Sequence, residues 1–314
     1  MSELQTHIKN YLEYCQRQKR LDKKTLKAYR IDLAQFCTKI ETGSIAEITA
    51  DVLEDFIAAL HQEYKPKTVK RKIASVKSLF HYLEYKDAIA RNPFNKLHIK
   101  FRDPVILPKT IPLRTVEDFL SAIYKYHSEA KTDFQKKNSL RDIAVIELLF
   151  ATGIRISELC SIKINDVNLY DRCILIYGKG SKERKIQLGN DDVIHALEEY
   201  KAAFQSEMQS SGYFFANQSG RAVSDQSIRR MINKYTSLAA IELHITPHMF
   251  RHTFATSLLE ADVDIRCIQE MLGHSSINIT EIYTHVAVSK QMDILITKHP
   301  RKEFHIQSHN DSVK

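Results

Sequence analysis

Apolar residues recur every three to four positions over the first 90 residues, and this spacing predicts amphipathic helices. Asp22 lies where one helix would begin, Thr49 is suited to the N-cap of the next, and Pro66 is suited to the first position of the last. We therefore predict an N-terminal domain of four helices over residues 1–90. The apolar stripes of the last three helices are Leu26, Tyr29, Leu33, Phe36 and Ile40, then Val52, Leu53, Phe56, Ile57 and Leu60, then Val69, Ile73, Val76, Phe80 and Leu83.

Prolines interrupt this pattern between residues 91 and 112. A proline cannot continue a helix interior, and it biases the residue before it toward extended backbone. Because the segment also lacks an apolar stripe, we predict an interdomain linker over residues 91–112. The prolines are Pro93, Pro104, Pro108 and Pro112.

A second domain is predicted over residues 113–300, with a polar tail over 301–314. Its first helix is expected to begin at Thr115, where Asp118 gives a near match to a capping box. Another helix, dense in apolar residues, is expected over residues 142–152, with Gly153 as its stop.

The middle of this domain has the pattern of a small sheet. Two β-like runs, residues 173–177 and 184–188, flank a turn that contains two glycines, which is typical of a hairpin. Residues 213–215 indicate a further short strand, and the chain from Asp225 onward has helical spacing. The predicted fold class is mostly α with a small antiparallel sheet.

The net charge of +8 is concentrated in the first third of the chain. Residues 1–103 contain 20 lysines and arginines against 13 acidic residues, whereas the remainder contains 26 against 25. A solvated basic surface would give this composition, but two basic amphipathic helices in one bundle favour a domain that binds DNA. The residues expected to contact DNA are Lys67, Lys70, Arg71 and Lys77.

The five cysteines are scattered and contain no CxxC pair, which predicts reduced thiols and excludes a disulfide framework or a cysteine zinc site. The first residues lack the charged-then-apolar layout of a signal peptide. No run of about 18 apolar residues is present. We expect a soluble, cytoplasmic protein with no membrane contact.

The last third of the sequence gathers groups that could cleave a phosphodiester without a metal ion. Arginine forks can clamp phosphoryl oxygens, an imidazole can move protons, and a phenol can attack phosphorus. Two short blocks, residues 246–252 and 272–274, carry most of these groups, and a third block lies almost a hundred residues upstream. The candidates are Arg155, His248, Arg251, His274 and Tyr283.

Each candidate also has an ordinary interpretation. Arg155 could be a surface residue paired with Glu158. Lys179 lies between two glycines at the hairpin tip and could be part of a solvated turn, since no P-loop sequence is present. His274 follows a helix-stop glycine and could cap that helix, and Tyr283 could belong to the core.

His248 and His252 have HxxxH spacing, as in zinc proteases. Met249 stands where HExxH requires glutamate, so we expect no metal site. His248, Arg251 and His252 share one helix face. The combination of groups carries more weight than any single residue.

Five blocks, in this order and spacing, resemble the tyrosine recombinase (phage integrase) family. In length and layout the chain is most similar to the Xer-type enzymes of that family, and the resemblance covers about residues 1–300. Both a host Xer protein that resolves chromosome dimers and an integrase of a mobile element fit these motifs. The blocks are ATGIRISEL, GKGSKER, HMFRHTFAT, LGHSS and IYTH.

The resemblance implies a role for each matching residue. Arg155 and Arg251 would hold the scissile phosphate and its transition-state charge. Lys179, 24 residues after the first arginine, would protonate the leaving 5′-oxygen. Glu158 would support the first arginine.

Tyr283 would be the nucleophile, His248 would shuttle its proton, and His274 would donate a hydrogen bond to the phosphate. A free phenol has a pKa of about 10 and is a poor nucleophile at neutral pH, so it needs a proton acceptor and a positive field. The phosphotyrosine linkage conserves the energy of the broken phosphodiester bond, so no ATP is expected. Because the arginines, lysine and histidines supply the positive field, no metal or other cofactor is expected either.

The family also implies an architecture. An N-terminal SAM-like core-binding bundle and an α/β catalytic domain would clamp double-stranded DNA. Four protomers, as a homo-tetramer or as a hetero-tetramer with a related recombinase, would exchange strands at two recombination sites through a Holliday junction. A type IB topoisomerase and a catalytically silent DNA-binding protein remain the alternatives.

Overall fold

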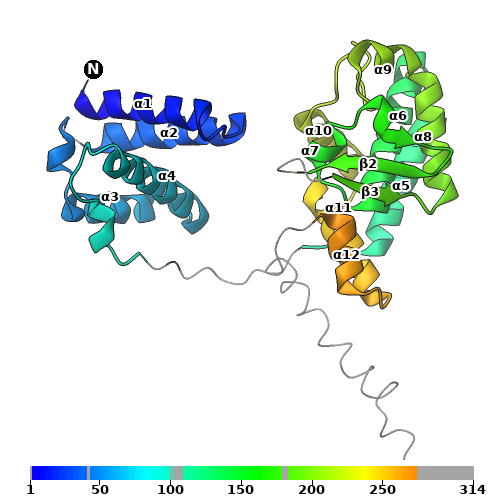
Figure 1. Cartoon of the computed structure of the whole chain (residues 1–314). Helices are drawn as coiled ribbons and strands as arrows, with labels where there is room; N and C mark the ends of the chain where they lie inside the picture. The colour runs from blue at the N-terminus through cyan, green and yellow to red at the C-terminus, as the bar shows by residue number, and fades with distance from the viewer. Residues whose placement is uncertain (1, 41–42, 100, 102–108, 179–182, 274–314) are drawn as a thin grey trace, which may run out of the picture. The chain divides into compact units, whose positions relative to one another are not determined.

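The computed structural model describes residues 2–40, 43–99, 101, 109–178 and 183–273 of the chain (Figure 1). The chain divides into two compact units, which we call the N-terminal unit, Met1–Pro104, and the C-terminal unit, Val105–Lys314. Each unit has its own cluster of buried apolar side chains. Described helices pack around a core in the first unit, and in the second a small sheet lies against a group of helices (Figure 1).

The N-terminal unit is a helical bundle whose helices begin where the sequence predicts. The Asp22 carboxylate accepts hydrogen bonds from the Lys24 and Thr25 amides, the Thr49 hydroxyl accepts one from the Val52 amide, and Pro66 is the first residue of its helix. The elements are α1 (Glu3–Arg17), α2 (Lys23–Lys39), η1 (Ile45–Glu47), α3 (Ala50–Glu63), α4 (Pro66–Tyr85) and η2 (Pro93–Lys96).

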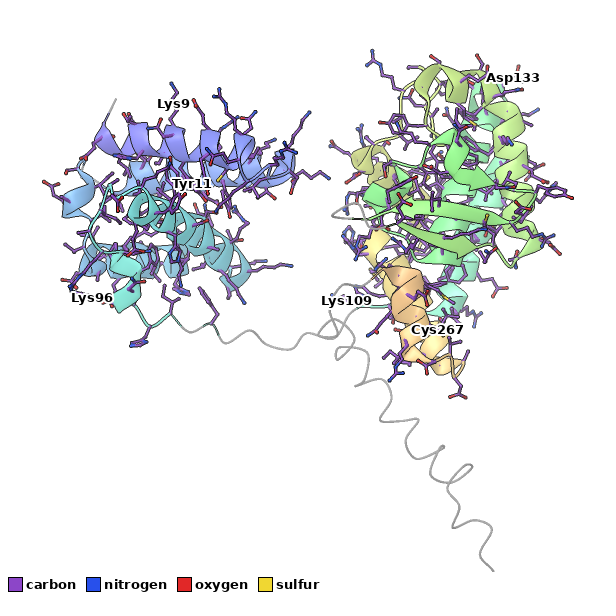
Figure 2. All side chains as sticks on the ribbon, viewed as in Figure 1. Lys9, Tyr11, Lys96, Lys109, Asp133 and Cys267 are labelled. Atoms are coloured by element: carbon purple, nitrogen blue, oxygen red, sulfur yellow. The ribbon has the colours of Figure 1, made fainter. Side chains whose placement is uncertain are left out.

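Aromatic packing fixes the centre of this bundle. Tyr11 of α1 is fully buried, stacks on Tyr29 and donates a hydrogen bond of 2.7 Å to the Ser78 hydroxyl of α4. Figure 2 shows Tyr11 inside the bundle and Lys9 of the same helix pointing outward. Phe94 of η2 is buried in the same core, so part of the segment predicted as a linker packs with the N-terminal unit.

A buried ion-pair cluster connects α2 to α4. The Asp32 carboxylate, which is inaccessible to solvent, accepts hydrogen bonds from the Arg71 guanidinium, from Ser75 Oγ at 3.0 Å and from Lys72 Nζ at 3.3 Å. A buried carboxylate is costly unless it is paired and hydrogen-bonded. Asp32 therefore fixes α4 against α2 and holds the Arg71 side chain on the helix surface.

The C-terminal unit is built around α6, which packs against α5, α8 and α11. Most of the last three turns of α6 are buried, as their dense apolar sequence predicts. The elements are α5 (Leu113–Ser128), α6 (Asp133–Thr152), α7 (Ile156–Leu159), η3 (Ile164–Asp166), β1 (Val167–Asn168), β2 (Cys173–Tyr177), β3 (Glu183–Gln187), α8 (Asp191–Ala203), α9 (Gln205–Ser211), α10 (Asp225–Leu238), α11 (Pro247–Glu260) and α12 (Ile265–Leu272).

The predicted hairpin is confirmed and forms two strands of an antiparallel sheet with the order β1-β2-β3. Ile174 pairs with Ile186, and both are buried against the core. The two-residue strand β1 was not predicted, because two residues are too few to show an alternating pattern. The sheet thereby presents one face to the helices, as a half-exposed antiparallel sheet does.

Three details of this unit differ from the sequence predictions. Helix α5 begins at Leu113, with Pro112 at its N-cap, so Thr115 already lies inside the first turn. Helix α6 begins nine residues before Asp142, at Asp133, because Thr132 caps it through the Gln135 amide. Residues 213–215 form no strand, and Tyr213 makes only an isolated bridge to Lys163.

Candidate active site

The first candidate arginine follows a tight helix end. Helix α6 stops at Gly153, whose φ of +59° lies in the left-handed region that favours glycine. A Cβ at this position would lie 2.7 Å from Cδ1 of Phe254 and 3.0 Å from Cδ2 of Leu272. This glycine therefore allows α6, α11 and α12 to approach one another, and two residues later Arg155 is the N-cap of α7.

Glu158 is the centre of a charged cluster beside Arg155. Its buried carboxylate accepts hydrogen bonds from the Arg155 amide at 2.9 Å, from Arg155 Nη1 at 2.8 Å and from Arg184 Nη2 at 2.7 Å. Burial alone would raise the pKa of the Glu158 carboxyl, but the hydrogen bonds from Arg184 and from the Arg155 backbone hold it below its usual range. Glu158 is therefore ionised at neutral pH, and the ordinary Arg155–Glu158 ion pair is present.

Arg251 connects two of the sequence blocks. Its buried guanidinium donates hydrogen bonds of 2.8 Å from Nη1 to the Gly153 carbonyl and of 2.8 Å from Nη2 to the Leu272 carbonyl. These carbonyls lie 98 and 21 residues away in the sequence. Arg251 thus joins the ends of α6 and α12, and the block that holds Arg155 lies beside the block that leads to His274.

The two histidines of α11 have different surroundings. Thr246 is the N-cap of α11 and Pro247 its first residue, as predicted, and His248 lies exposed in the first turn. His252, one turn later, is half-buried. Burial lowers the pKa of the His252 imidazole, and electrostatic interactions with His248 and Arg251 lower it further. His252 is therefore neutral at pH 7, a property that the shared helix face did not reveal.

Three candidates lie outside the described residues, namely Lys179, His274 and Tyr283. The described chain ends next to two of them: β2 and Gly178 precede Lys179, and Gly273, the C-cap of α12, precedes His274. The structure thus brings together Arg155, Glu158 and Arg251, together with Arg184, which sequence reasoning did not assign. Arg184 is part of the GKGSKER block, but its sequence position gave no sign of its partners.

Within the described residues, no group of three or more His, Cys, Asp or Glu side chains could hold a metal ion. None of the described helices combines the length and the apolar character needed to cross a membrane.

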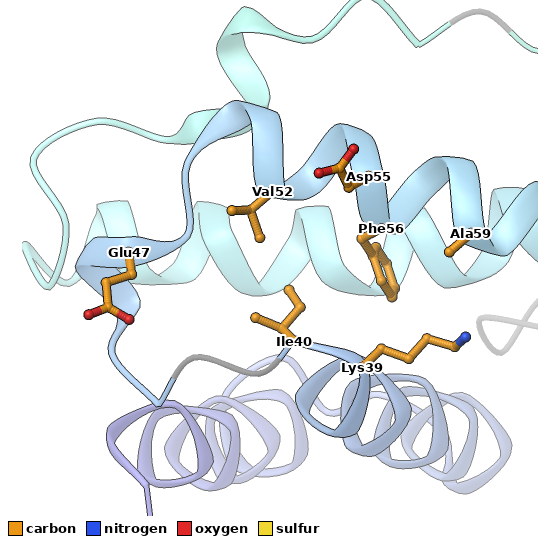
Figure 3. A pocket seen from close by; sticks show the side chains of 7 residues that line it. All are labelled: Lys39, Ile40, Glu47, Val52, Asp55, Phe56 and Ala59. Atoms are coloured by element: carbon orange, nitrogen blue, oxygen red, sulfur yellow. The ribbon is translucent and has the colours of Figure 1, made fainter.

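In the N-terminal unit, a pocket of about 450 Å³ lies between α2, η1 and α3 (Figure 3). Of its charged groups, Lys39, Glu47 and Asp55, none is a candidate from the sequence.

The four residues expected to contact DNA are exposed on α4. Lys70 and Lys77 are seven residues apart and share one face of the helix. Arg71 is held by the Asp32 carboxylate, so its charge is partly balanced within the unit. This pairing makes Arg71 a weaker candidate for a phosphate contact than its charge alone suggests.

A salt titration tests this assignment. We expect the Lys70→Ala, Lys77→Ala double variant to flatten the slope of log affinity against log salt by about two units, because each phosphate contact contributes about 0.9. The preference for one DNA sequence over another should change little, because phosphate contacts carry no sequence information. Lys9→Ala, an exposed lysine of α1, is the control for a change in net charge. An unchanged slope in the double variant would instead identify α4 as a solvated basic surface.

Two family models match the two units separately. The model described as the phage integrase family matches residues 114–290, and the model described as the phage integrase N-terminal SAM-like domain matches residues 8–86. The first match covers more than half of the chain. This protein belongs to the phage integrase family, whose members are the tyrosine recombinases.

Individual relatives agree with this classification. A protein of Agathobacter rectalis named tyrosine recombinase is 68% identical over 305 residues, which cover 97% of this chain and 100% of that protein. Tyrosine recombinase XerC of Oceanobacillus iheyensis is 33% identical over 313 residues, which cover 96% and 98% of the two chains. The chain is thus similar to Xer-type recombinases over nearly its whole length.

Solved structures of a Xer-type protein share the fold. The XerH recombinase bound to its difH substrate before cleavage is 25% identical, with a TM-score of 0.66, over 86% of this chain and 79% of that chain. The XerH post-cleavage complex with palindromic difH has a TM-score of 0.74 at 23% identity, over 91% and 83% of the two chains. The mostly helical fold with a small antiparallel sheet is therefore confirmed.

Proposed function

We propose that this protein is a site-specific tyrosine recombinase that cuts and rejoins duplex DNA through a 3′-phosphotyrosine intermediate and a Holliday junction. The observation that carries the proposal is the pair of hydrogen bonds from Arg251 to the Gly153 and Leu272 carbonyls. They join blocks that are far apart in the sequence into one basic site. Family membership and the Xer-type relatives support the same activity.

In the proposed reaction, the Tyr283 oxygen attacks the scissile phosphorus and the bond from phosphorus to the 5′-oxygen breaks. His248 accepts the proton of the phenol, and the Lys179 ammonium donates a proton to the leaving 5′-oxygen. Arg155 and Arg251 hold the charge of the non-bridging oxygens, and His274 donates a further hydrogen bond to them. A 5′-hydroxyl from a partner strand then attacks the phosphotyrosine and reverses these steps.

The residues divide between the two units as follows. We propose residues 1–90 as the core-binding domain, 113–300 as the catalytic domain and 301–314 as a polar tail. Residues 91–112 would form the linker, whose first part packs on the N-terminal unit through Phe94. The protein would work in the cytoplasm on two DNA sites, as a tetramer of one recombinase or of two related ones. A topoisomerase and a silent DNA-binding protein are not favoured, because the similar proteins over the full length are named as recombinases.

Covalent trapping in chelator tests this function. We expect the wild-type protein to form a denaturant-resistant adduct with a nicked suicide duplex in excess EDTA, because arginines and lysine supply the positive charge that a metal would otherwise provide. The duplex carries the tightest-binding sequence selected from a random library, hereafter the selected site. Two such duplexes should also exchange strands. Activity that disappears in EDTA and returns with added magnesium or zinc would contradict the mechanism, and relaxation of supercoils without strand exchange would favour a topoisomerase.

A further inference from the structure

Arg184 contacts two separate parts of the candidate active site. It is the second residue of β3, five residues after Lys179, and only 10% of its side chain is exposed. Its Nη1 and Nη2 atoms donate to the two Glu158 oxygens at 3.2 and 2.7 Å, and its Nε donates to the Met271 carbonyl at 2.8 Å. One guanidinium thus connects the hairpin strand, the turn that holds Arg155 and the last turn of α12.

The charges in this cluster do not cancel. Two guanidiniums, Arg155 and Arg184, share the single Glu158 carboxylate, which leaves a net charge of about +1 if all three groups are ionised. Arg184 forms a two-pronged pair with Glu158, the geometry in which an arginine–carboxylate interaction is strongest. Without Arg184, the Glu158 carboxylate would keep its ion pair with Arg155 and would compete with a phosphate for that guanidinium.

The end of α12 is held in the same way. The unpaired carbonyls of a helix C-terminus attract cations, and here Arg184 binds the Met271 carbonyl while Arg251 binds the Leu272 carbonyl. Gly273 follows with a φ of +64°, and a Cβ there would lie 3.0 Å from Arg184 Nη1. The close contact fixes where the chain leaves α12 immediately before His274.

We propose that Arg184 is a positioning residue for DNA cleavage, an inference that rests on the proposed recombinase function. It neutralises Glu158, so that the charge of Arg155 remains available to the scissile phosphate. It also holds strand β3 and the C-terminal end of α12 against the turn that contains Arg155. In this proposal Arg184 acts through Glu158 and the end of α12, and Arg155 is the group that binds the phosphate.

Single-turnover cleavage of the suicide duplex with the selected site, at saturating protein, separates this role from DNA binding. We expect Arg184→Ala to slow adduct formation by about 100-fold, the scale for removing a preorganised charge contact, with a dissociation constant within about threefold of wild type. Arg184→Lys, which keeps the charge but loses the fork, should be intermediate. Lys185→Ala, at the exposed neighbouring position of β3, should cleave like wild type.

The cleavage rate of the double variant Arg184→Ala, Glu158→Gln distinguishes a role in charge balance from a purely structural role. Since it removes the unbalanced carboxylate along with the guanidinium, it should cleave about tenfold faster than Arg184→Ala. Wild-type cleavage rates in Arg184→Ala would overturn the proposal, as would a double variant no faster than the single one. If Arg184→Ala does not fold, the same comparison is made with Arg184→Lys. Absence of any adduct in wild type would instead contradict the recombinase function itself.

Discussion

Replacing Tyr283 by phenylalanine is expected to abolish covalent attachment to the selected site while leaving DNA affinity near the wild-type value. The substitution removes one oxygen atom, and with it the proposed nucleophile, but it keeps the ring. The positive groups proposed to bind the phosphate, Arg155 and Arg251, remain. The measurement is the yield of denaturant-resistant adduct on the nicked suicide duplex, together with the dissociation constant from a gel-shift titration.

Tyr170→Phe is the matched control, since Tyr170 is 96% exposed in the turn before β2. This variant should form the adduct at the wild-type rate. If Tyr283→Phe still gives a denaturant-resistant protein–DNA adduct, another residue is the nucleophile and the assignment of the last sequence block is wrong.

Lys179→Ala and Arg155→Ala should respond in opposite ways to a change in the leaving group. Both variants are expected to cleave ordinary DNA at least about 100-fold more slowly than wild type. A substrate with sulfur at the 5′-bridging position has a leaving group that needs no proton. Cleavage by Lys179→Ala should therefore recover on the sulfur substrate, whereas Arg155→Ala should remain slow because the charge on the non-bridging oxygens is unchanged.

The comparison uses single-turnover rates on the two substrates, with Lys185→Ala as a control for the loss of a lysine from the same hairpin. Equal recovery of Lys179→Ala and Arg155→Ala would mean that the proton-donating and charge-holding roles are assigned to the wrong residues.

Local signals in the sequence predicted the parts of the fold that depend on neighbouring residues. Asp22 and Thr49 accept hydrogen bonds from amides within three residues, and Gly153 and Gly273 end their helices in the left-handed conformation that glycine favours. Errors arose where the local pattern was ambiguous. Thr115 has the sequence of an N-cap, but Val116 already donates its amide hydrogen to the Pro112 carbonyl, so the helix begins earlier.

The contacts of the candidate site join residues that are far apart in the sequence, and no local sequence pattern predicts such contacts. Arg184 reaches Glu158 across 26 residues and Met271 across 87, and Arg251 reaches Gly153 across 98. The family resemblance named Arg155, Glu158 and Arg251 because their types and spacing match a motif. It did not name Arg184. The charge pattern of the fourth helix had placed Arg71 among the DNA contacts, and it gave no sign that this side chain is paired with Asp32.

The central claim is that a tyrosine near the end of this chain becomes joined to a DNA 3′-phosphate. The most direct measurement is mass spectrometry of the peptide that remains linked to DNA after wild-type protein is trapped on the suicide duplex in EDTA, denatured and digested. We predict a single modified peptide that carries a nucleotide 3′-phosphate on Tyr283. A nucleotide on any other residue, or a linkage to the 5′-phosphate, would contradict the account.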